Sequence, residues 1–240
     1  MIQVSAQQLQ RFRSIWKAFG RGIAPLASAD WRQLSNDDVW IRVVIQVVVV
    51  GRAEPADRLH DYELRRRLAW NRISRMDDVE TAKTISYILR KIGARYAGSD
   101  WRTCKKTKAL IRNRNYLRIH PGGPRGFIKD VATLPGSSRD KVMFVAERLS
   151  YIKNKGARDF LTTGFGFVKD HIAFDSRVLG ALRHIGLTFP DKVASQTNLY
   201  DELERDLIRQ VCRPLRISGA QLDQLLFLHY RDIKAAVNRD

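Results

Sequence analysis

Two residues of the sequence, Lys155 and Asp175, have side chains that could carry out chemistry together. A lysine amine that has lost its proton is a nucleophile and can form a Schiff base with an electrophilic carbon. A carboxylate twenty residues further along can stabilise positive charge that develops in the same reaction. Each residue also has an ordinary explanation, because a lysine at a helix start is commonly solvated and an aspartate before a helix is commonly its N-cap.

The segment around these residues predicts a helix, a tight hairpin and a second helix. Apolar residues recur at helical spacing between residues 139 and 149, after a predicted N-cap at Ser137. The hairpin has one apolar residue, Ile152, as its anchor, and the second helix is expected to begin at Lys155. A glycine-containing connection then leads to a further helix with Asp175 at its N-cap.

This pattern resembles the helix-hairpin-helix (HhH-GPD) DNA glycosylases, and in particular the small second family of 8-oxoguanine DNA glycosylase/AP lyases. The matching residues are Ile152, the run 155–161, and the run 172–175 followed by Val178 and Leu179. The likeness covers most of the chain from about residue 37 to residue 230, thinly outside this core motif. It implies an all-α enzyme that acts on DNA.

The resemblance implies that Lys155 is the nucleophile and Asp175 its partner carboxylate. The amine would attack C1′ of a nucleotide flipped out of the duplex, and the carboxylate would stabilise positive charge on the sugar. A helix N-terminus and a partly dry pocket both disfavour a charged amine. The implied reaction is removal of 8-oxoguanine through a lysine Schiff base, with strand cleavage by elimination. Two alternatives stay open: a glycosylase for another damaged or modified base, and a non-catalytic helical DNA-binding protein.

The hairpin departs from the family pattern. The family carries two glycines around the apolar residue, which let backbone N–H groups approach a phosphate, and here those positions are Tyr151 and Lys153. Lys153 could supply a side-chain contact instead. A rival placement starts at Leu134-Pro135-Gly136 and makes Lys141 the nucleophile, as in a divergent archaeal branch with a longer separation between lysine and aspartate.

The composition favours a polyanionic partner. Lys and Arg number 43 against 25 Asp and Glu, so the net charge is +18. Each basic side chain placed on a phosphate releases counterions, whereas neither a signal peptide nor an apolar run of membrane-spanning length is found in the sequence. Basic residues gather between Leu89 and Arg125. The residues predicted to contact DNA are Arg102, Lys105, Lys106, Lys153, Asn154, Arg158 and Arg177.

The two cysteines, Cys104 and Cys212, are too few for a structural zinc or iron–sulfur site built on cysteines. We therefore expect no metal and a reducing, cytoplasmic location. The resemblance implies that no cofactor is needed and that the protein is a monomer whose partner is double-stranded DNA containing a damaged base. In the base pocket, the resemblance places Phe227 where an aromatic stacks on the damaged base, with Asp223 one turn earlier. Gln46 could face the same pocket, although core packing is the ordinary explanation for Phe227.

Helical patterns recur along the chain, for example from Asp77 to Gly93 and after Ser218. The run from Val43 to Val50 has strand-like propensity. A lone strand would lack a partner, so this run is assigned to a buried helix that starts near Ser35. We expect two helical lobes with the helix-hairpin-helix at their junction and DNA between them. The central lobe should span residues 36–161, and residues 1–35 and 162–240 should form the other.

Overall fold

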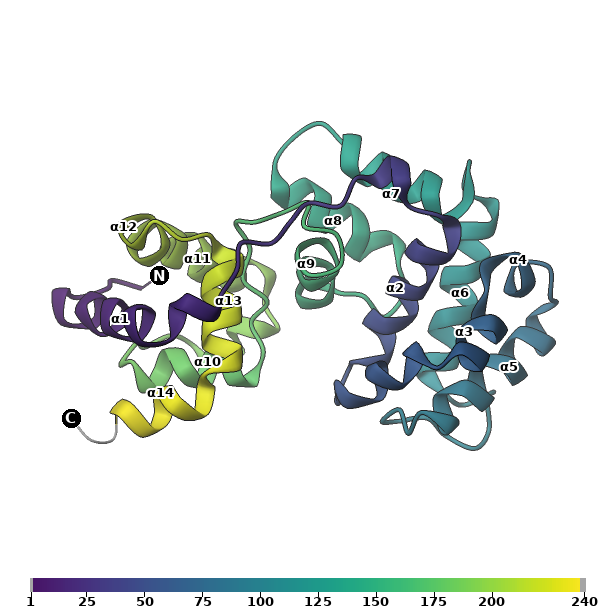
Figure 1. The fold of residues 1–240 in the computed structure, drawn as a ribbon, viewed down its shortest axis with the longest axis horizontal. Helices are drawn as coiled ribbons and strands as arrows, with labels where there is room; N and C mark the ends of the chain where they lie inside the picture. The colour runs from purple at the N-terminus through teal and green to yellow at the C-terminus, as the bar shows by residue number, and fades with distance from the viewer. Residues whose placement is uncertain (1, 238–240) are drawn as a thin grey trace. The chain divides into compact units, whose positions relative to one another are not determined.

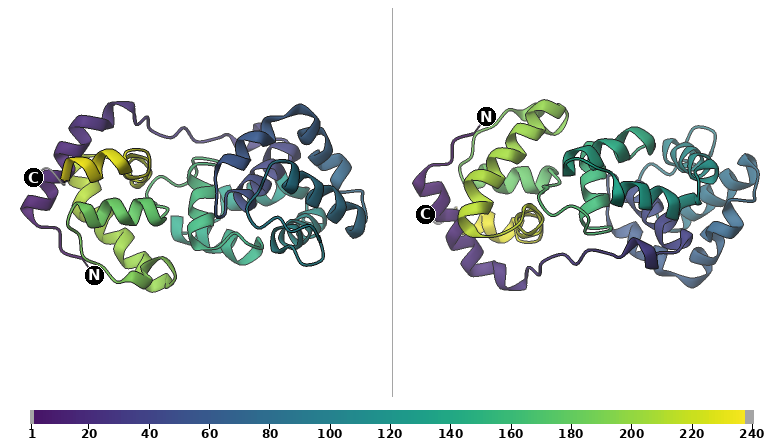
Figure 2. Two further views of the ribbon diagram at one scale, coloured as in Figure 1. Left: turned by 90° about the horizontal axis from the view of Figure 1, so that it is seen from below. Right: turned by 90° about the horizontal axis from the view of Figure 1, so that it is seen from above.

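The computed structural model describes residues 2–237, and every regular element in that part of the chain is a helix. Figures 1 and 2 show the helices from three directions. The predicted all-α class is confirmed. No helix among the described residues combines the length and apolar character that a bilayer crossing requires.

The chain forms two compact units, which we call the central unit (residues 29–160) and the terminal unit (residues 1–28 and 161–240). The central unit begins before the expected residue 36, because the short 3₁₀ helix Trp31–Gln33 packs against α7 (Gly123–Thr133). There, Arg125 Nη2 donates to the carbonyl of Arg32 at 2.8 Å. The elements of the central unit are α2 (Asn36–Val48), α3 (Tyr62–Leu68), α4 (Trp70–Ile73), α5 (Asp78–Lys91), α6 (Lys105–Ile119), α7 (Gly123–Thr133), α8 (Ser138–Arg148) and α9 (Asn154–Thr162), which crosses into the terminal unit.

Helix α2 lies at the centre of its unit and packs against α4, α6 and α7. Ser35 caps it reciprocally with Asp38, and eight of its thirteen residues are buried, including the valines at 43, 44, 47 and 48. The assignment of this valine-rich run to a helix is confirmed. Burial on nearly all sides and a strong N-cap outweigh the small β preference of branched side chains.

The terminal unit brings together both ends of the chain around a second core. Its elements are α1 (Ala6–Phe19), α10 (Ser176–His184), α11 (Thr197–Leu207), a π-helical turn (Ile208–Cys212), α12 (Arg213–Leu215), α13 (Gly219–Leu228) and α14 (Tyr230–Val237). Helix α10 packs against α13 and α14, and the π-helical turn contacts α1. The backbone N–H of Ile2 donates to Asp206 Oδ2 at 3.0 Å, which ties the N-terminal segment to α11.

The glycine- and proline-rich run at residues 121–125 forms a tight turn that leads directly into α7. Helix α7 already begins at Gly123, behind a left-handed Gly122 with φ of 76°, and Pro124 sits in its first turn. Proline is favourable there because its missing N–H would have no helical partner.

Candidate active site

The structure contains the predicted helix, hairpin and helix. Ser137 caps α8 reciprocally with Asp140, α8 ends at Arg148, and α9 begins at Asn154. Ile152 is fully buried beneath the turn, as an anchor should be. The hairpin is also held from α6, because Asn113 Nδ2 donates to the carbonyl of Ser150 at 3.0 Å and Asn113 Oδ1 accepts from the Ser150 N–H at 2.6 Å.

Asn113 was not predicted from the sequence. It occupies the buried side of α6 between Leu110 and Leu117. A polar residue on an otherwise apolar helix face needs a hydrogen-bond partner, and this spacing was the available signal.

Tyr151 adopts the left-handed conformation, with φ of 71°. This is one of the two positions where the resembling family carries glycine. A residue with a Cβ pays about 1–2 kcal/mol for that conformation, so the surrounding contacts must hold it in place. At position 151 the hairpin therefore keeps a backbone conformation that favours glycine, without the glycine.

Lys155 lies in the first turn of α9 and is half-buried. Gln46 on α2 reaches this helix: its Nε2 donates to Asp159 Oδ2 at 3.2 Å, and a Cβ on Gly156 would lie 3.5 Å from the same amide nitrogen. Within the described residues of the central unit, no hydrogen bond or ion pair engages the Lys155 amine. Gln46 is thus next to the helix that carries Lys155, and its role in a base pocket stays a prediction.

The rival lysine has a different environment. Lys141 Nζ donates to the carbonyls of Val131 and Ala132, at 3.0 and 2.6 Å, and so closes the C-terminal end of α7. Burial lowers the pKa of this amine. Because both carbonyls would lose their donor if Lys141 attacked a sugar, the side chain is better suited to a structural role.

Asp175 lies in the terminal unit, at the N-cap of α10. Its Oδ1 accepts from the N–H groups of Arg177 and Val178, both at 2.9 Å. The carboxylate is half-buried, so it keeps an accessible side. The predicted N-cap is confirmed, with Oδ1 as the capping atom.

The two other predicted pocket residues lie on α13, which packs against α10. Phe227 is partly buried against the core, and the guanidinium of Arg177 lies 4.9 Å from the centre of its ring. Asp223 Oδ1 accepts from the N–H of Ala173 at 3.0 Å, two residues before Asp175. Both residues are therefore in the neighbourhood of Asp175, and contact with a base stays a prediction.

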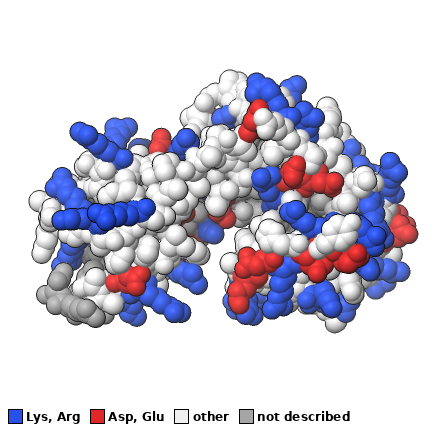
Figure 3. Space-filling model, in the orientation of Figure 1, with Lys and Arg blue, Asp and Glu red and all other residues white. Residues whose placement is uncertain are grey.

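Most of the predicted DNA-contacting residues are accessible. Arg102, Lys105, Lys153 and Arg177 are exposed, and Asn154 is half-buried. Figure 3 shows basic side chains spread over one face of the molecule with smaller acidic groups between them. Arg102 also lies over the ring of Trp101, at 4.7 Å, which presents an aromatic and a cation together.

Two of those predictions are wrong. Lys106 is fully buried, and its Nζ donates to the carbonyls of Val48 and Val50 at 2.7 and 2.8 Å, just beyond the last turn of α2. Arg158 is 1% exposed, and its Nη1 donates to the carbonyl of Asn154 at 3.3 Å. A buried cation cannot reach a phosphate, so both side chains hold the protein rather than DNA.

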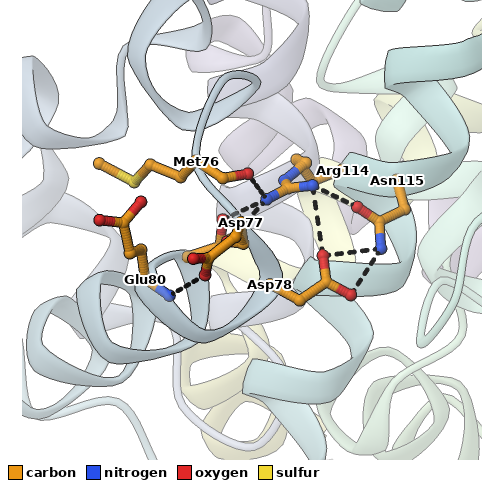
Figure 4. A network of polar contacts seen from close by, with 7 residues as sticks. Met76, Asp77, Asp78, Glu80, Arg114 and Asn115 are labelled. Atoms are coloured by element: carbon orange, nitrogen blue, oxygen red, sulfur yellow. Dashed lines mark hydrogen bonds and ion pairs between the residues drawn. The ribbon is translucent and has the colours of Figure 1, made fainter.

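Arg114, in the same basic stretch, is also structural. It is buried, and its guanidinium donates to the carbonyls of Met76 and Asp77 and to Thr81 Oγ1, with Asp78 Oδ1 at 3.3 Å (Figure 4). It thereby fastens the start of α5 to α6. The number of basic residues in the sequence is therefore larger than the number that are accessible to a ligand.

Metal chemistry has no candidate site in residues 2–237, where no three potential His, Cys, Asp or Glu ligands come together. The central unit carries the Lys155 amine on α9, and the terminal unit carries the Asp175 carboxylate before α10. An amine can act as a nucleophile, and a carboxylate can stabilise positive charge.

No protein-family model matches the sequence, and no curated protein matches it significantly. Solved structures do match. The Methanocaldococcus jannaschii 8-oxoguanine glycosylase/lyase, in complex with a 15mer DNA containing 8-oxoguanine, aligns with a TM-score of 0.65 at 14% identity over 93% of this chain and 96% of its own. A second structure, of the M. jannaschii 8-oxoguanine DNA glycosylase, gives 0.64 at 15% identity over 93% and 92%.

The 8-oxoguanine DNA glycosylase of Thermotoga maritima aligns with a TM-score of 0.60 at 18% identity, over 92% of this chain and 93% of its own. These likenesses extend over nearly the whole of each chain, at identities of 14 to 18%. The chain therefore has the fold of the 8-oxoguanine DNA glycosylases.

Proposed function

We propose that this protein is a DNA glycosylase with AP lyase activity that removes 8-oxoguanine from double-stranded DNA. The observation that carries the proposal is the coincidence of this fold with a lysine in the first turn of the second hairpin helix and an aspartate capping the helix after the connection. The excess of positive charge supports a nucleic-acid substrate.

In the proposed reaction the neutral amine of Lys155 attacks C1′ of the flipped nucleotide. The bond from C1′ to the base breaks, and its electron pair leaves with the base, which takes up a proton. Loss of a proton from nitrogen and opening of the C1′–O4′ bond, with O4′ protonated, give the Schiff base. Removal of a proton from C2′ then breaks the C3′–O3′ bond and expels the 3′ phosphate.

Asp175 is assigned to charge stabilisation in the first of these steps. Positive charge develops on the sugar as the base departs, and a carboxylate fixed by two backbone N–H groups meets that charge without rearranging. The hairpin and the exposed cations Lys153, Arg102 and Lys105 are assigned to DNA phosphates. We propose that one monomer acts on one lesion.

Borohydride trapping tests the nucleophile. Hydride reduces the Schiff-base carbon, so wild-type protein and a duplex containing 8-oxoguanine should yield a covalent adduct. The adduct should disappear in Lys155→Gln and persist in Lys129→Gln, a matched change of an exposed lysine on α7. An adduct that survives Lys155→Gln and is lost in Lys141→Gln would move the nucleophile to α8.

The identity of the base is tested with a panel of duplexes that carry different lesions. Release of 8-oxoguanine in preference to other bases supports the proposal. Release of another base, with 8-oxoguanine left in place, would indicate a glycosylase of different specificity and contradict the proposal. Salt-sensitive DNA binding with no base released from any duplex would leave a non-catalytic DNA-binding protein.

A further inference from the structure

An extended segment, residues 172–174, leads directly into Asp175 and has no secondary structure of its own. Its three consecutive backbone N–H groups are all taken by side chains. Ile172 donates to Glu204 Oε1 at 2.8 Å, Ala173 to Asp223 Oδ1 at 3.0 Å and Phe174 to the Tyr200 hydroxyl at 2.8 Å.

Tyr200 makes a second bond to the same segment, since its hydroxyl donates to the carbonyl of Ile172 at 2.8 Å. Its ring packs against Phe174 with centroids 4.7 Å apart, and the whole side chain is 1% exposed. The Tyr200 hydroxyl therefore bonds to residues 172 and 174 at once and restrains the backbone between them.

The other two acceptors are also held in place. Glu204 is buried on α11, and its Oε2 lies 2.9 Å from His171 Nδ1. Helix α13, which carries Asp223, approaches closely because Gly219 has no side chain: a Cβ there would lie 2.9 Å from the backbone nitrogen of His171. Three polar side chains, two from α11 and one from α13, thus hold one short segment.

We infer that Tyr200, Glu204 and Asp223 are positioning residues that set the place of the Asp175 carboxylate. A carboxylate that stabilises a developing charge must stand at a defined distance from it, and a displacement of about 1 Å can slow a reaction by about 100-fold. Residues 172–174 are buried, so water cannot satisfy their N–H groups, and each depends instead on an acceptor from a side chain distant in the sequence. The inference rests on the proposed function.

The test compares two reactions in Tyr200→Phe, which keeps the ring and removes both hydroxyl bonds. Base excision from an 8-oxoguanine duplex under single-turnover conditions needs Asp175 and should slow by roughly 10- to 100-fold. Borohydride trapping on a duplex with a preformed abasic site needs Lys155 but no bond to a base, so it should change by less than about threefold.

Tyr230→Phe is the matched control. It makes the same change in the same unit, at a hydroxyl with no hydrogen bond among the described residues, and both reactions should keep their wild-type rates. A second pair uses Asp223: Asp223→Asn retains an acceptor for Ala173 and should excise faster than Asp223→Ala by about 10-fold.

Three outcomes would overturn the inference. Excision by Tyr200→Phe at the wild-type rate would do so, as would a parallel fall of excision and trapping, which indicates general structural damage. Equal excision by Asp223→Asn and Asp223→Ala would be the third. Each leaves the proposed function standing, whereas a wild-type protein that excises no base would overturn both.

Discussion

Lys106 offers a quantitative test of the packing around α2. Its amine is fully buried and donates to two carbonyls, those of Val48 and Val50. Burial lowers the pKa of this amine from 10.5 to about 8, partly opposed by the nearby Cys104 thiol. Lys106→Met removes the amine while keeping a long apolar chain in the space.

The fall in pKa sets the pH dependence. Below about pH 8 the amine is protonated in both the folded and the unfolded state. Between about 8 and 10.5 the unfolded chain keeps a proton that the folded protein has lost, so stability rises with pH through this window. The full difference in pKa corresponds to a gain of about 3 kcal/mol in the free energy of unfolding, since each unit of pKa is worth about 1.4 kcal/mol.

The Lys106→Met variant lacks this gain in stability with pH, because it has no amine at position 106. Near pH 7 the cost of burying the charge offsets much of the free energy that the two hydrogen bonds contribute. The substitution should therefore lower the free energy of unfolding by no more than about 2 kcal/mol. Near pH 10 the neutral amine has two N–H donors for its two carbonyls, and the same substitution should cost about 2–3 kcal/mol more than it does near pH 7.

The assay is urea unfolding followed by tryptophan fluorescence at several pH values. Four of the five tryptophans, at positions 31, 40, 70 and 101, belong to the central unit that contains Lys106. Lys105→Met is the matched control, because it makes the same change at the neighbouring lysine, whose side chain is exposed. A difference between wild type and Lys106→Met that stays constant from pH 7 to pH 10 would refute the reasoning.

Three other predictions follow from the same contacts. Lys105→Met should reduce the slope of log Kd against log salt by about 1 in DNA-binding titrations, and Lys106→Met should leave that slope unchanged. Asp175→Ala should lose an N-cap worth about 1 kcal/mol in thermal unfolding, whereas Asp175→Asn should keep the cap; excision should fall in both, and retained excision by either would contradict the proposed role. Arg114→Met should cost about 3 kcal/mol in urea unfolding, because it strips several buried acceptors of their donor at once; a cost below about 1 kcal/mol would count against that network.

Local features of the site could be predicted from the sequence. The caps at Ser137 and Asp175 are each formed by a side chain and a backbone N–H two or three residues away, so neighbouring residues are enough to specify them. The hairpin anchor Ile152 is marked by its apolar character between two amphipathic segments. The helical class follows from spacing that repeats along most of the chain.

What only the tertiary structure decided is which polar side chains are accessible. Lys105 and Lys106 are adjacent and chemically identical, yet one faces solvent and the other caps α2 from inside, because α6 packs against α2 along one face. The N–H groups of residues 172–174 donate to Tyr200, Glu204 and Asp223, which lie 26 to 50 positions further along the chain. Such contacts depend on how helices distant in sequence come together, and no local pattern encodes that packing.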